Sequence, residues 1–308
     1  MIAFIDQYRD RFSVEFMCQT LHQARVGGFI TSRGYRDAKR RPISARARRD
    51  EELVELIRRI HAANYSVYGI RKMWRALERH GVNIGRDQTA RLMRKAGVCG
   101  KAKGRSPVTT RKGRRPDRRP DLVERHFHAD GPNRLWVADI TYVRVKGSSF
   151  VYTAFVTDVF SRRIVGWAVS ETMTTETLPL QALHQAISTA QGGFEELIHH
   201  SDHGAQYVSI AYGTMLAEAG IQSSTGTVGD SYDNALAENV NGSYKNELIH
   251  NQEWTDALEV EIATLEWVHW WNNARLHENL NYATPNETEA LYWTSQPTIE
   301  TSKHKAKA

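Results

Sequence analysis

The sequence LWVADITY, residues 135–142, sets one carboxylate, Asp139, inside a run of apolar, aromatic and β-branched side chains. Side chains of these types are typical of strands, so we predict a strand over residues 135–145. An unpaired charge inside a buried strand is costly, so Asp139 needs either a partner or a function. Asp139 is therefore the first candidate site residue.

The residues that follow this strand predict a mixed α/β sheet. Strands over residues 150–157 and 163–170 come after short turns, and they are most simply antiparallel to the first strand. Three strands followed by strand–helix alternation favour a five-stranded sheet with helices on its faces. The remaining strands are expected over 196–200 and 221–224, and the helices over 175–190, 208–219, 233–249 and 255–273. The last helix is expected to pack through Leu258, Ile262, Leu265, Val268 and Trp271.

Charge divides the chain into two parts. Residues 1–120 hold 30 Lys and Arg against 11 Asp and Glu, whereas residues 121–308 hold 11 against 24. The basic part is suited to bind a polyanion, and the acidic part is able to hold cations. No apolar run reaches the ~18 residues of a membrane span. Two cysteines exclude a disulfide scaffold and a Cys-rich zinc finger, so we expect a cytoplasmic protein without a membrane anchor.

The basic part predicts a DNA-binding region. Three amphipathic helices, over residues 50–61, 68–80 and 86–96, resemble a helix-turn-helix module whose last helix enters a major groove. A structural bundle with a solvated Arg face is the alternative. The linker that follows is rich in Arg and is expected to contact DNA phosphates, unless it is only a solvated spacer. The candidate DNA-binding residues are Arg86, Gln88, Arg91, Arg94 and Lys95 on the last helix and Arg111, Lys112, Arg114 and Arg115 in the linker.

Composition divides the chain into five segments. We predict an N-terminal helical segment (1–48), a helix-turn-helix-like DNA-binding domain (49–99) and a basic linker (100–124). An α/β catalytic core (125–290) and a polar tail (291–308) follow.

Two further acids join Asp139 as candidates. Asp202 directly follows the fourth strand, and Glu238 lies on the helix after a loop that contains glycine. Three carboxylates that converge from two strands and a helix repel one another unless a cation neutralises them, and oxygen ligands suit Mg²⁺, with Mn²⁺ as a substitute. A lone acid is more often a cap or an ion-pair partner, and we interpret Asp158, Asp230 and Asp233 in this way. The crowded His199, His200 and His203 lack the spacing of a zinc site.

Four separated motifs carry a resemblance to the integrase core of bacterial insertion-sequence transposases. In this sequence 35 residues lie between Asp202 and Glu238, and this spacing matches the D,D(35)E signature shared with retroviral integrases. Lys245 follows Glu238 by seven residues, as that signature also expects. The motifs are WVADITY (136–142), DVFSRRIVGW (158–167), HSDHG (200–204) and WNNARLH (271–277) with Leu280, Tyr282 and Pro285 after it.

The resemblance implies a ribonuclease-H-like integrase core, preceded by an all-α helix-turn-helix region, in a DDE transposase. Asp139, Asp202 and Glu238 would be the catalytic residues and would hold two Mg²⁺ ions. Water would cut DNA at the transposon end, and the freed 3′-hydroxyl would attack target DNA. Lys245 would position a phosphate, unless it is a surface lysine, and Asn234 and Asn241 could orient DNA or the carboxylate.

The resemblance also implies partners. The chain would be the second-frame product (OrfB) of an insertion sequence, joined by frameshifting to the upstream-frame protein (OrfA). A homo-oligomer would assemble with transposon ends and target DNA at the bacterial nucleoid. Two other functions stay open, a non-catalytic DNA-binding remnant and a ribonuclease-H-like nuclease that cuts without joining. The three carboxylates argue against the remnant, and the basic N-terminal part argues against the nuclease.

Overall fold

The computed structural model describes residues 1–102, 120–123, 126–194, 196–202, 204, 206–225 and 235–296, and the chain divides into two compact units, residues 1–56 and 57–308. Three helices form most of the first unit: α1 (Ile2–Tyr8), α2 (Val14–Ala24) and α3 (Ser32–Arg40). Their small core consists of Ile5, Met17, Cys18 and Tyr35. The boundary between the units falls inside α4 (Ala45–Ala63).

Two short helices follow α4 in the second unit. They are α5 (Ile70–Arg79) and α6 (Arg86–Ala96), and α6 has the predicted bounds. Their apolar positions recur at helical spacing, so Met73, Leu77 and Leu92 are buried while Arg86, Arg94 and Lys95 are exposed. Gly97 ends α6 with a left-handed φ of 72°, a conformation that glycine adopts without a steric penalty.

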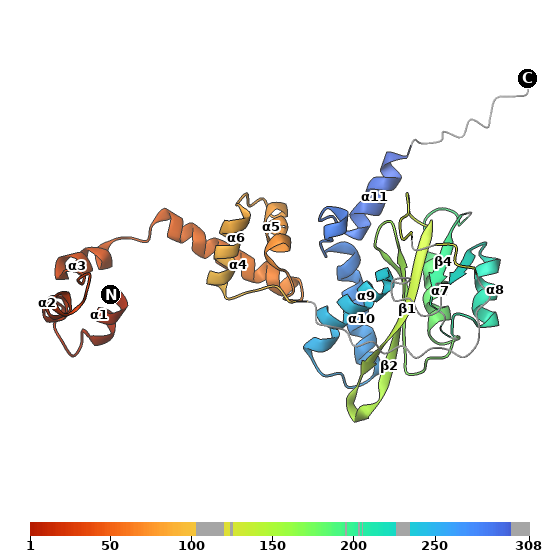
Figure 1. Ribbon diagram of the computed structural model, residues 1–308, viewed down its shortest axis with the longest axis horizontal. Coiled ribbons are helices and arrows are strands. Elements are labelled where there is room, and N and C mark those ends of the chain that lie inside the picture. The colour runs from red at the N-terminus through yellow and green to blue at the C-terminus, as the bar shows by residue number, and fades with distance from the viewer. Residues whose placement is uncertain are drawn as a thin grey trace, which may run out of the picture. The chain divides into compact units, whose positions relative to one another are not determined.

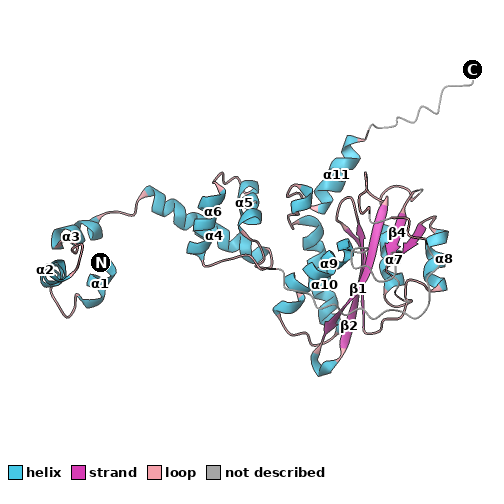
Figure 2. Ribbon diagram, in the orientation of Figure 1, coloured by secondary structure: helices cyan, strands magenta, loops and turns pink. Residues whose placement is uncertain are grey.

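A five-stranded mixed sheet forms the centre of the second unit (Figure 2). The strands lie in the order β3-β2-β1-β4-β5; β1–β2 and β2–β3 are antiparallel, whereas β1–β4 and β4–β5 are parallel. This topology agrees with the expected ribonuclease-H-like fold. The bounds are β1 (Leu135–Arg144), β2 (Phe150–Asp158), β3 (Ile164–Ser170), β4 (Ile198–Ser201) and β5 (Gln222–Thr225).

Helices cover both faces of the sheet (Figure 1). On one face, α7 (Pro179–Thr189) and α8 (Ile210–Glu218) pack on Trp136, Ala138 and neighbouring strand residues. α7 lies so close to β3 that a Cβ on Gly166 would come within 2.0 Å of the Ala182 carbonyl oxygen. The sheet therefore requires glycine at this position.

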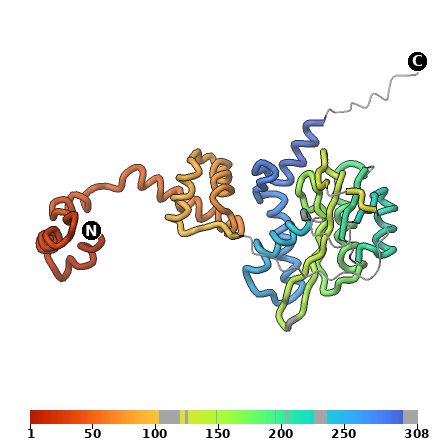
Figure 3. Tube along the Cα trace, viewed as in Figure 1, coloured from red at the N-terminus to blue at the C-terminus, as the bar shows by residue number. Residues whose placement is uncertain are grey.

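The opposite face carries α9 (Ala235–Glu247) and α10 (Ala257–Asn273), which lie beside strands far away in sequence (Figure 3). An aromatic cluster joins them to the sheet: the ring centroids of Phe155 on β2 and Tyr244 on α9 are 5.0 Å apart, and those of Tyr244 and Trp267 on α10 are 5.2 Å apart. The aromatic end of α10 is thus part of the core, as predicted.

The packing face of α10 corrects one expectation. Val268 and Trp271 are buried as predicted, but Leu258, Ile262 and Leu265 are exposed, and Val260, Thr264 and Trp267 are buried in their place. Thr264 belongs to this buried stripe because its hydroxyl bonds to Tyr244 Oη at 2.7 Å and donates to the Val260 carbonyl oxygen at 2.6 Å. Apolar side chains occur on two faces of α10, so their spacing alone could not identify the buried one.

A further helix, α11 (Pro285–Ser295), was not predicted, and it extends past residue 290. It begins with a capping box in which the Thr284 hydroxyl accepts from the Glu287 amide and the Glu287 carboxylate accepts from the Thr284 amide. The remaining one-turn helices are η1 (Lys146–Ser148), η2 (Ile249–Asn251) and η3 (Glu278–Leu280). None of the helices in the described residues combines the length and apolar character that crossing a bilayer requires.

Candidate active site

The register of β1 and β4 brings two of the predicted carboxylates together. Ala138 on β1 pairs with Ser201 on β4; Asp139 is the next residue of β1, and Asp202 is the first residue after β4. Because the two strands are parallel neighbours about 4.8 Å apart, the two acids lie at the same level of the sheet. Asp139 therefore lies where the ladder between β1 and β4 ends.

Specific hydrogen bonds orient both carboxylates. Asp139 Oδ1 accepts from the Ile140 amide at 2.8 Å, and its Oδ2 accepts from Asn241 Nδ2 on α9, also at 2.8 Å. Asp202 Oδ1 accepts from the Gly204 amide at 2.9 Å. Each acid is thus held by the main chain next to it, and Asp139 is also tied to α9.

Asp139 has a strongly perturbed acidity. Burial and the neighbouring charge of Asp202 raise the pKa of Asp139 to about 7, and the charge of Glu238 adds a smaller effect in the same direction. The hydrogen bonds from Ile140 and Asn241 oppose this rise because they favour the ionised form. A carboxyl group whose pKa is raised by burial and by a neighbouring charge is a recurrent feature of functional sites.

Glu238 approaches from the first turn of α9, where the helix dipole favours a carboxylate. Its side chain is exposed, and partial desolvation raises its pKa. Glu238, Asn241 and Lys245 are three, then four, residues apart, so they share one face of α9. Asn241 on that face contacts Asp139, so all three predicted acids belong to the same end of the sheet.

Lys245 also belongs to this region. Its Nζ lies 4.2 Å from the ring centroid of Tyr142, which stands exposed three residues after Asp139 on β1. Burial lowers the pKa of Lys245, and the negative charge of Asp139 opposes that change. A cation held on an aromatic face beside the carboxylates is positioned to meet an anionic substrate.

The donor set fits a hard divalent cation, although the third acid does not complete a site. Within the described residues, no three Asp, Glu, His or Cys side chains lie close enough together to form a metal site. Asn241 Oδ1 is buried without a hydrogen-bond partner while its Nδ2 contacts Asp139. Carboxylate and amide oxygens are the ligands that Mg²⁺ and Mn²⁺ prefer.

Two residues near the acids escaped the sequence interpretation. The Tyr207 hydroxyl is buried without a hydrogen-bond partner, and burial, with smaller effects from Tyr212, Asp139 and Asp202, raises its pKa well above the ordinary value. Tyr142 is exposed beside Lys245. Tyr142 gave no signal in the sequence because aromatic residues are common in strands, and Tyr207 gave none because it lies in the turn between β4 and α8; Asn241, by contrast, was singled out.

The other acids and the histidines behave as interpreted where the structure describes them. Asp158 caps the turn before β3: its Oδ1 accepts from the amide and hydroxyl of Ser161, and its Oδ2 accepts from the Asn133 amide. His199 and His200 are buried and bond to Tyr212 and Ser224, respectively. Asp230, Asp233, Asn234 and His203 lie outside the described residues.

The predicted DNA-binding side chains of α6 divide by exposure. Arg86, Gln88, Arg94 and Lys95 are exposed, whereas Arg91 is half-buried and has a partner. Exposed polar side chains on the third helix are what a groove-reading helix needs. Arg111, Lys112, Arg114 and Arg115 lie outside the described residues.

Comparisons with known proteins cover both the helices and the α/β core. A family profile described as "Integrase core domain" matches residues 129–231, and another with the same description matches residues 219–285. A profile described as "HTH-like domain" matches residues 48–106.

The chain is similar to several curated proteins. The transposase for insertion sequence element IS629 of Shigella sonnei is 44% identical over 96% of this chain and 97% of that protein. A Mycobacterium tuberculosis protein named for the transposase of IS986/IS6110 is 48% identical over 85% of this chain and 95% of that protein. Among solved structures, the HTLV-2 integrase catalytic core domain, in complex with magnesium, aligns at 21% identity and a TM-score of 0.40, covering 53% of this chain and 99% of that one.

Proposed function

The chain belongs to the bacterial insertion-sequence transposases with an integrase core, and from this premise we propose that it catalyses magnesium-dependent cleavage and strand transfer of DNA. One observation carries the proposal: Asp139 on β1 and Asp202, directly after β4, lie at the same level of adjacent parallel strands, and the charge of Asp202 helps to raise the pKa of Asp139. Divalent cations neutralise carboxylates that lie this close together, and in two-ion sites they stabilise the attacking and leaving oxygens of a phosphodiester.

Asp139, Asp202 and Glu238 would hold the ions. The donor set supports this assignment because its members are carboxylates, and the unpartnered Asn241 Oδ1 offers a further oxygen beside Asp139. When bound, magnesium supplies the positive charge that activates the attacking oxygen and stabilises the leaving oxygen. A side-chain rotation of Glu238 toward the other two acids completes the proposed set.

Other residues would orient the DNA. The Lys245 ammonium, held on the Tyr142 ring, would bind a phosphate next to the carboxylates as a point charge. Asn241 would keep Asp139 in the rotamer that points its Oδ2 toward α9. The attacking group is water in the first step and the freed 3′-hydroxyl in the second, so no side chain serves as the nucleophile.

The basic N-terminal part would read the transposon ends. The exposed polar face of α6 supports DNA binding by Arg86, Gln88, Arg94 and Lys95, and we extend the proposal to the linker arginines and to Arg91. We further propose assembly of several copies on DNA at the bacterial nucleoid, with the upstream-frame protein supplied by a frameshift fusion.

The proposal is tested with the full chain, DNA substrates that carry the element's ends, and magnesium. Asp139→Asn, Asp202→Asn and Glu238→Gln are each expected to abolish strand transfer from a pre-cut end with a free 3′-hydroxyl, while end binding is retained. Asp130→Asn removes an exposed acid from the same unit and serves as the matched control, with activity unchanged.

The same assay separates the other two functions. A wild-type chain that binds ends but neither cuts nor joins them, alone or with the upstream-frame protein, is a non-catalytic DNA-binding protein. Cleavage without any joined product identifies a nuclease. Strand transfer that survives in one of the three variants removes that acid from the catalytic site.

A further inference from the structure

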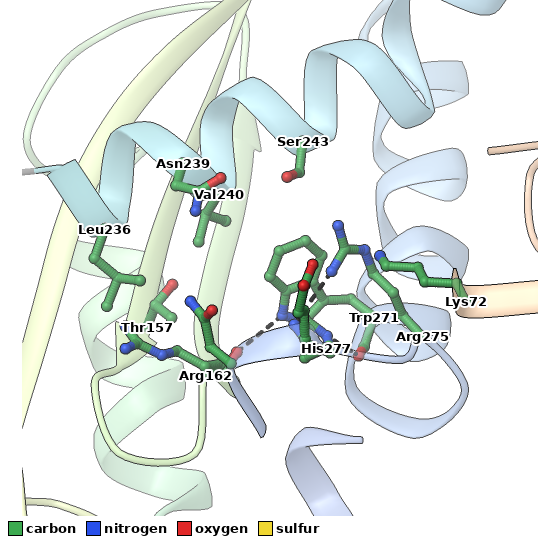
Figure 4. A pocket seen from close by; sticks show the side chains of 12 residues that line it. Lys72, Thr157, Arg162, Leu236, Asn239, Val240, Ser243, Trp271, Arg275 and His277 are labelled. Atoms are coloured by element: carbon green, nitrogen blue, oxygen red, sulfur yellow. Dashed lines mark hydrogen bonds between the residues drawn. The ribbon is translucent and has the colours of Figure 1, made fainter. Parts of the chain in front are cut away.

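A basic pocket lies on the side of α9 that faces away from the acids. Its volume is about 210 Å³, and α5, the turn after β2, α9 and the chain after α10 contribute to its walls (Figure 4). Asn239 and Ser243, four residues apart on α9, line it, whereas Glu238, Asn241 and Lys245 belong to the other face of the helix. The pocket is thus distinct from the site of Asp139.

Most of the charges around the pocket are already matched. The Arg275 guanidinium donates to both carboxylate oxygens of Glu247, at distances from 2.6 to 3.1 Å, and both side chains are buried. Arg71 pairs with Glu278 at 2.8 Å. Burial, together with the charges of Arg275 and Lys72, lowers the pKa of His277 to about 2, so this imidazole is neutral.

Two cations remain without a carboxylate partner among the residues that the structure describes. Lys72, on α5, contacts only the ring of Tyr68 with its ammonium group, at 5.5 Å from the centroid. Arg162 lies in the turn before β3 and adopts a left-handed φ of 62°. Asp158 acts on Arg162 through its charge, but the oxygens of Asp158 accept from Ser161 and Asn133.

Both cations lose solvation in the pocket. Burial and the like charge of Arg275 lower the pKa of Lys72 to about 8, although the charges of Glu247 and Glu278 oppose this fall, and burial also lowers the pKa of Arg162. A cation that loses solvation without an ion-pair partner is costly unless an anion binds beside it. The pocket therefore has an excess of positive charge, which an anionic ligand would neutralise.

We propose that this pocket binds a backbone phosphate of DNA, with Lys72 and Arg162 as its cationic ligands and Asn239 and Ser243 as polar neighbours. The guanidinium fork and the ammonium group are the two side-chain types that bind phosphate oxygens in proteins. The choice of DNA over a free anion rests on the proposed function. Lys72 comes from the HTH-like region, and the pocket shares α9 with the proposed catalytic site.

Salt dependence of DNA binding tests the proposal. The full chain, the double variant Lys72→Gln/Arg162→Gln and the control Lys146→Gln, an exposed lysine in η1, are titrated with a short DNA duplex of arbitrary sequence. Each phosphate that a protein neutralises adds about 0.9 to the slope of log K against log salt. We expect the double variant to lose about 1 from this slope and to bind about tenfold more weakly at low salt, and the control to keep the wild-type slope.

Crosslinking supplies a readout that does not depend on affinity. In a Cys99→Ser background, Ser243→Cys places a thiol on the pocket wall, and Ser188→Cys places one on α7, across the sheet. DNA with a thiol-reactive group on one backbone phosphorothioate should crosslink to the first thiol and not to the second. Inorganic phosphate should compete for the same ligands, so the crosslink at the first thiol should fall when phosphate replaces chloride at constant ionic strength; a crosslink that phosphate leaves unchanged contradicts an anion site.

The outcomes separate this inference from the proposed function. A double variant with the wild-type salt slope, or equal crosslinking at both thiols, overturns the phosphate pocket, even if the three acids prove essential for strand transfer. A double variant with the reduced salt slope supports the pocket, and if the wild-type chain is inactive in strand transfer, only the catalytic proposal is overturned. Thermal unfolding of the double variant should match the wild type or exceed it, because a cation repulsion is removed.

Discussion

Asp139 carries a cost to folding because its charge is buried beside Asp202. Its pKa of about 7, against an ordinary 3.8, means that the native chain holds a proton there that the unfolded chain has already lost. Stability from this group therefore falls as pH rises from about 4 to about 7, and the full penalty is present above pH 7. Residues kept against stability in this way are typical of catalytic sites.

Replacement of this acid should stabilise the chain. In metal-free buffer, Asp139→Asn is expected to raise the free energy of unfolding by on the order of 2–4 kcal/mol at pH 8, since each unit of pKa shift corresponds to about 1.4 kcal/mol. The gain should be smaller at pH 5, where wild-type Asp139 is protonated in the folded chain. Urea denaturation with a chelator at both pH values measures the difference. A variant that is less stable at pH 8 contradicts the burial of a charged Asp139.

Asn241 should act on the metal through Asp139. Asn241→Ala removes the hydrogen bond to Asp139 Oδ2, and loss of such a supporting contact typically costs 10–100-fold in metal affinity or activity. The half-saturating magnesium concentration for strand transfer should rise accordingly. Asn246→Ala, on the same helix but bonded to the Ala102 carbonyl oxygen, is the control. Equal magnesium requirements for both variants would show that Asn241 only supports the fold.

At the scale of elements, local sequence patterns predicted the strands of the sheet, but they did not predict which face of a helix is buried, because tertiary contacts determine that face. β1 ends at Arg144 against a predicted end at residue 145, because alternation and β-branched side chains mark strands directly. Leu258 and Ile262 were expected in the core and are exposed, since Thr264 and Trp267 form the buried stripe of α10. In the site, a charge inside the first strand identified Asp139, and the position directly after the fourth strand identified Asp202; the Lys245–Tyr142 contact depends on packing and was not predictable.

One side chain ties α10 to the edge of the sheet. Asn272 Oδ1 accepts from the Ile164 amide, and its Nδ2 donates to the Ile164 carbonyl oxygen, both at 2.9 Å. β3 is an edge strand of the sheet, so this amide satisfies main-chain groups that no further strand reaches.

Loss of that amide should weaken the fold. Asn272→Leu leaves a buried donor and a buried acceptor unpaired, at about 1–3 kcal/mol for each. We expect a loss of about 3 kcal/mol in the free energy of unfolding, measured by urea denaturation. Glu261→Gln, at an exposed position of the same helix, should stay within about 0.5 kcal/mol of the wild type. Similar losses for both variants would mean that Asn272 does not hold β3.

At the scale of the whole molecule, the HTH-like helices of the second unit are docked on the end of the core. Tyr68 is buried, its oxygen accepts from the Leu276 amide at 2.9 Å, and burial raises its pKa to about 12. Arg79 on α5 pairs with both oxygens of Glu287 at 2.8 Å. These contacts couple the HTH-like helices to the chain segment that also lines the proposed phosphate pocket.

The docking predicts cooperative behaviour. Tyr68→Phe leaves the Leu276 amide buried and unpaired, which costs about 1–3 kcal/mol. Hydrogen exchange should accelerate both in α5 and in residues 274–277, because the two segments protect each other. Arg86→Gln, which removes an exposed pair with Asp87 on α6, should change neither segment by more than a few fold. Faster exchange in α5 alone would contradict the docking.

The central claim is that three acids, scattered through the sequence, hold one divalent-ion site in the second unit. Manganese binding to the full chain without DNA, followed by electron paramagnetic resonance, tests it most directly. The account predicts that the wild-type chain and Asp130→Asn bind Mn²⁺, and that Asp139→Asn, Asp202→Asn and Glu238→Gln each bind it far more weakly. Unchanged Mn²⁺ binding in all three variants would contradict the claim.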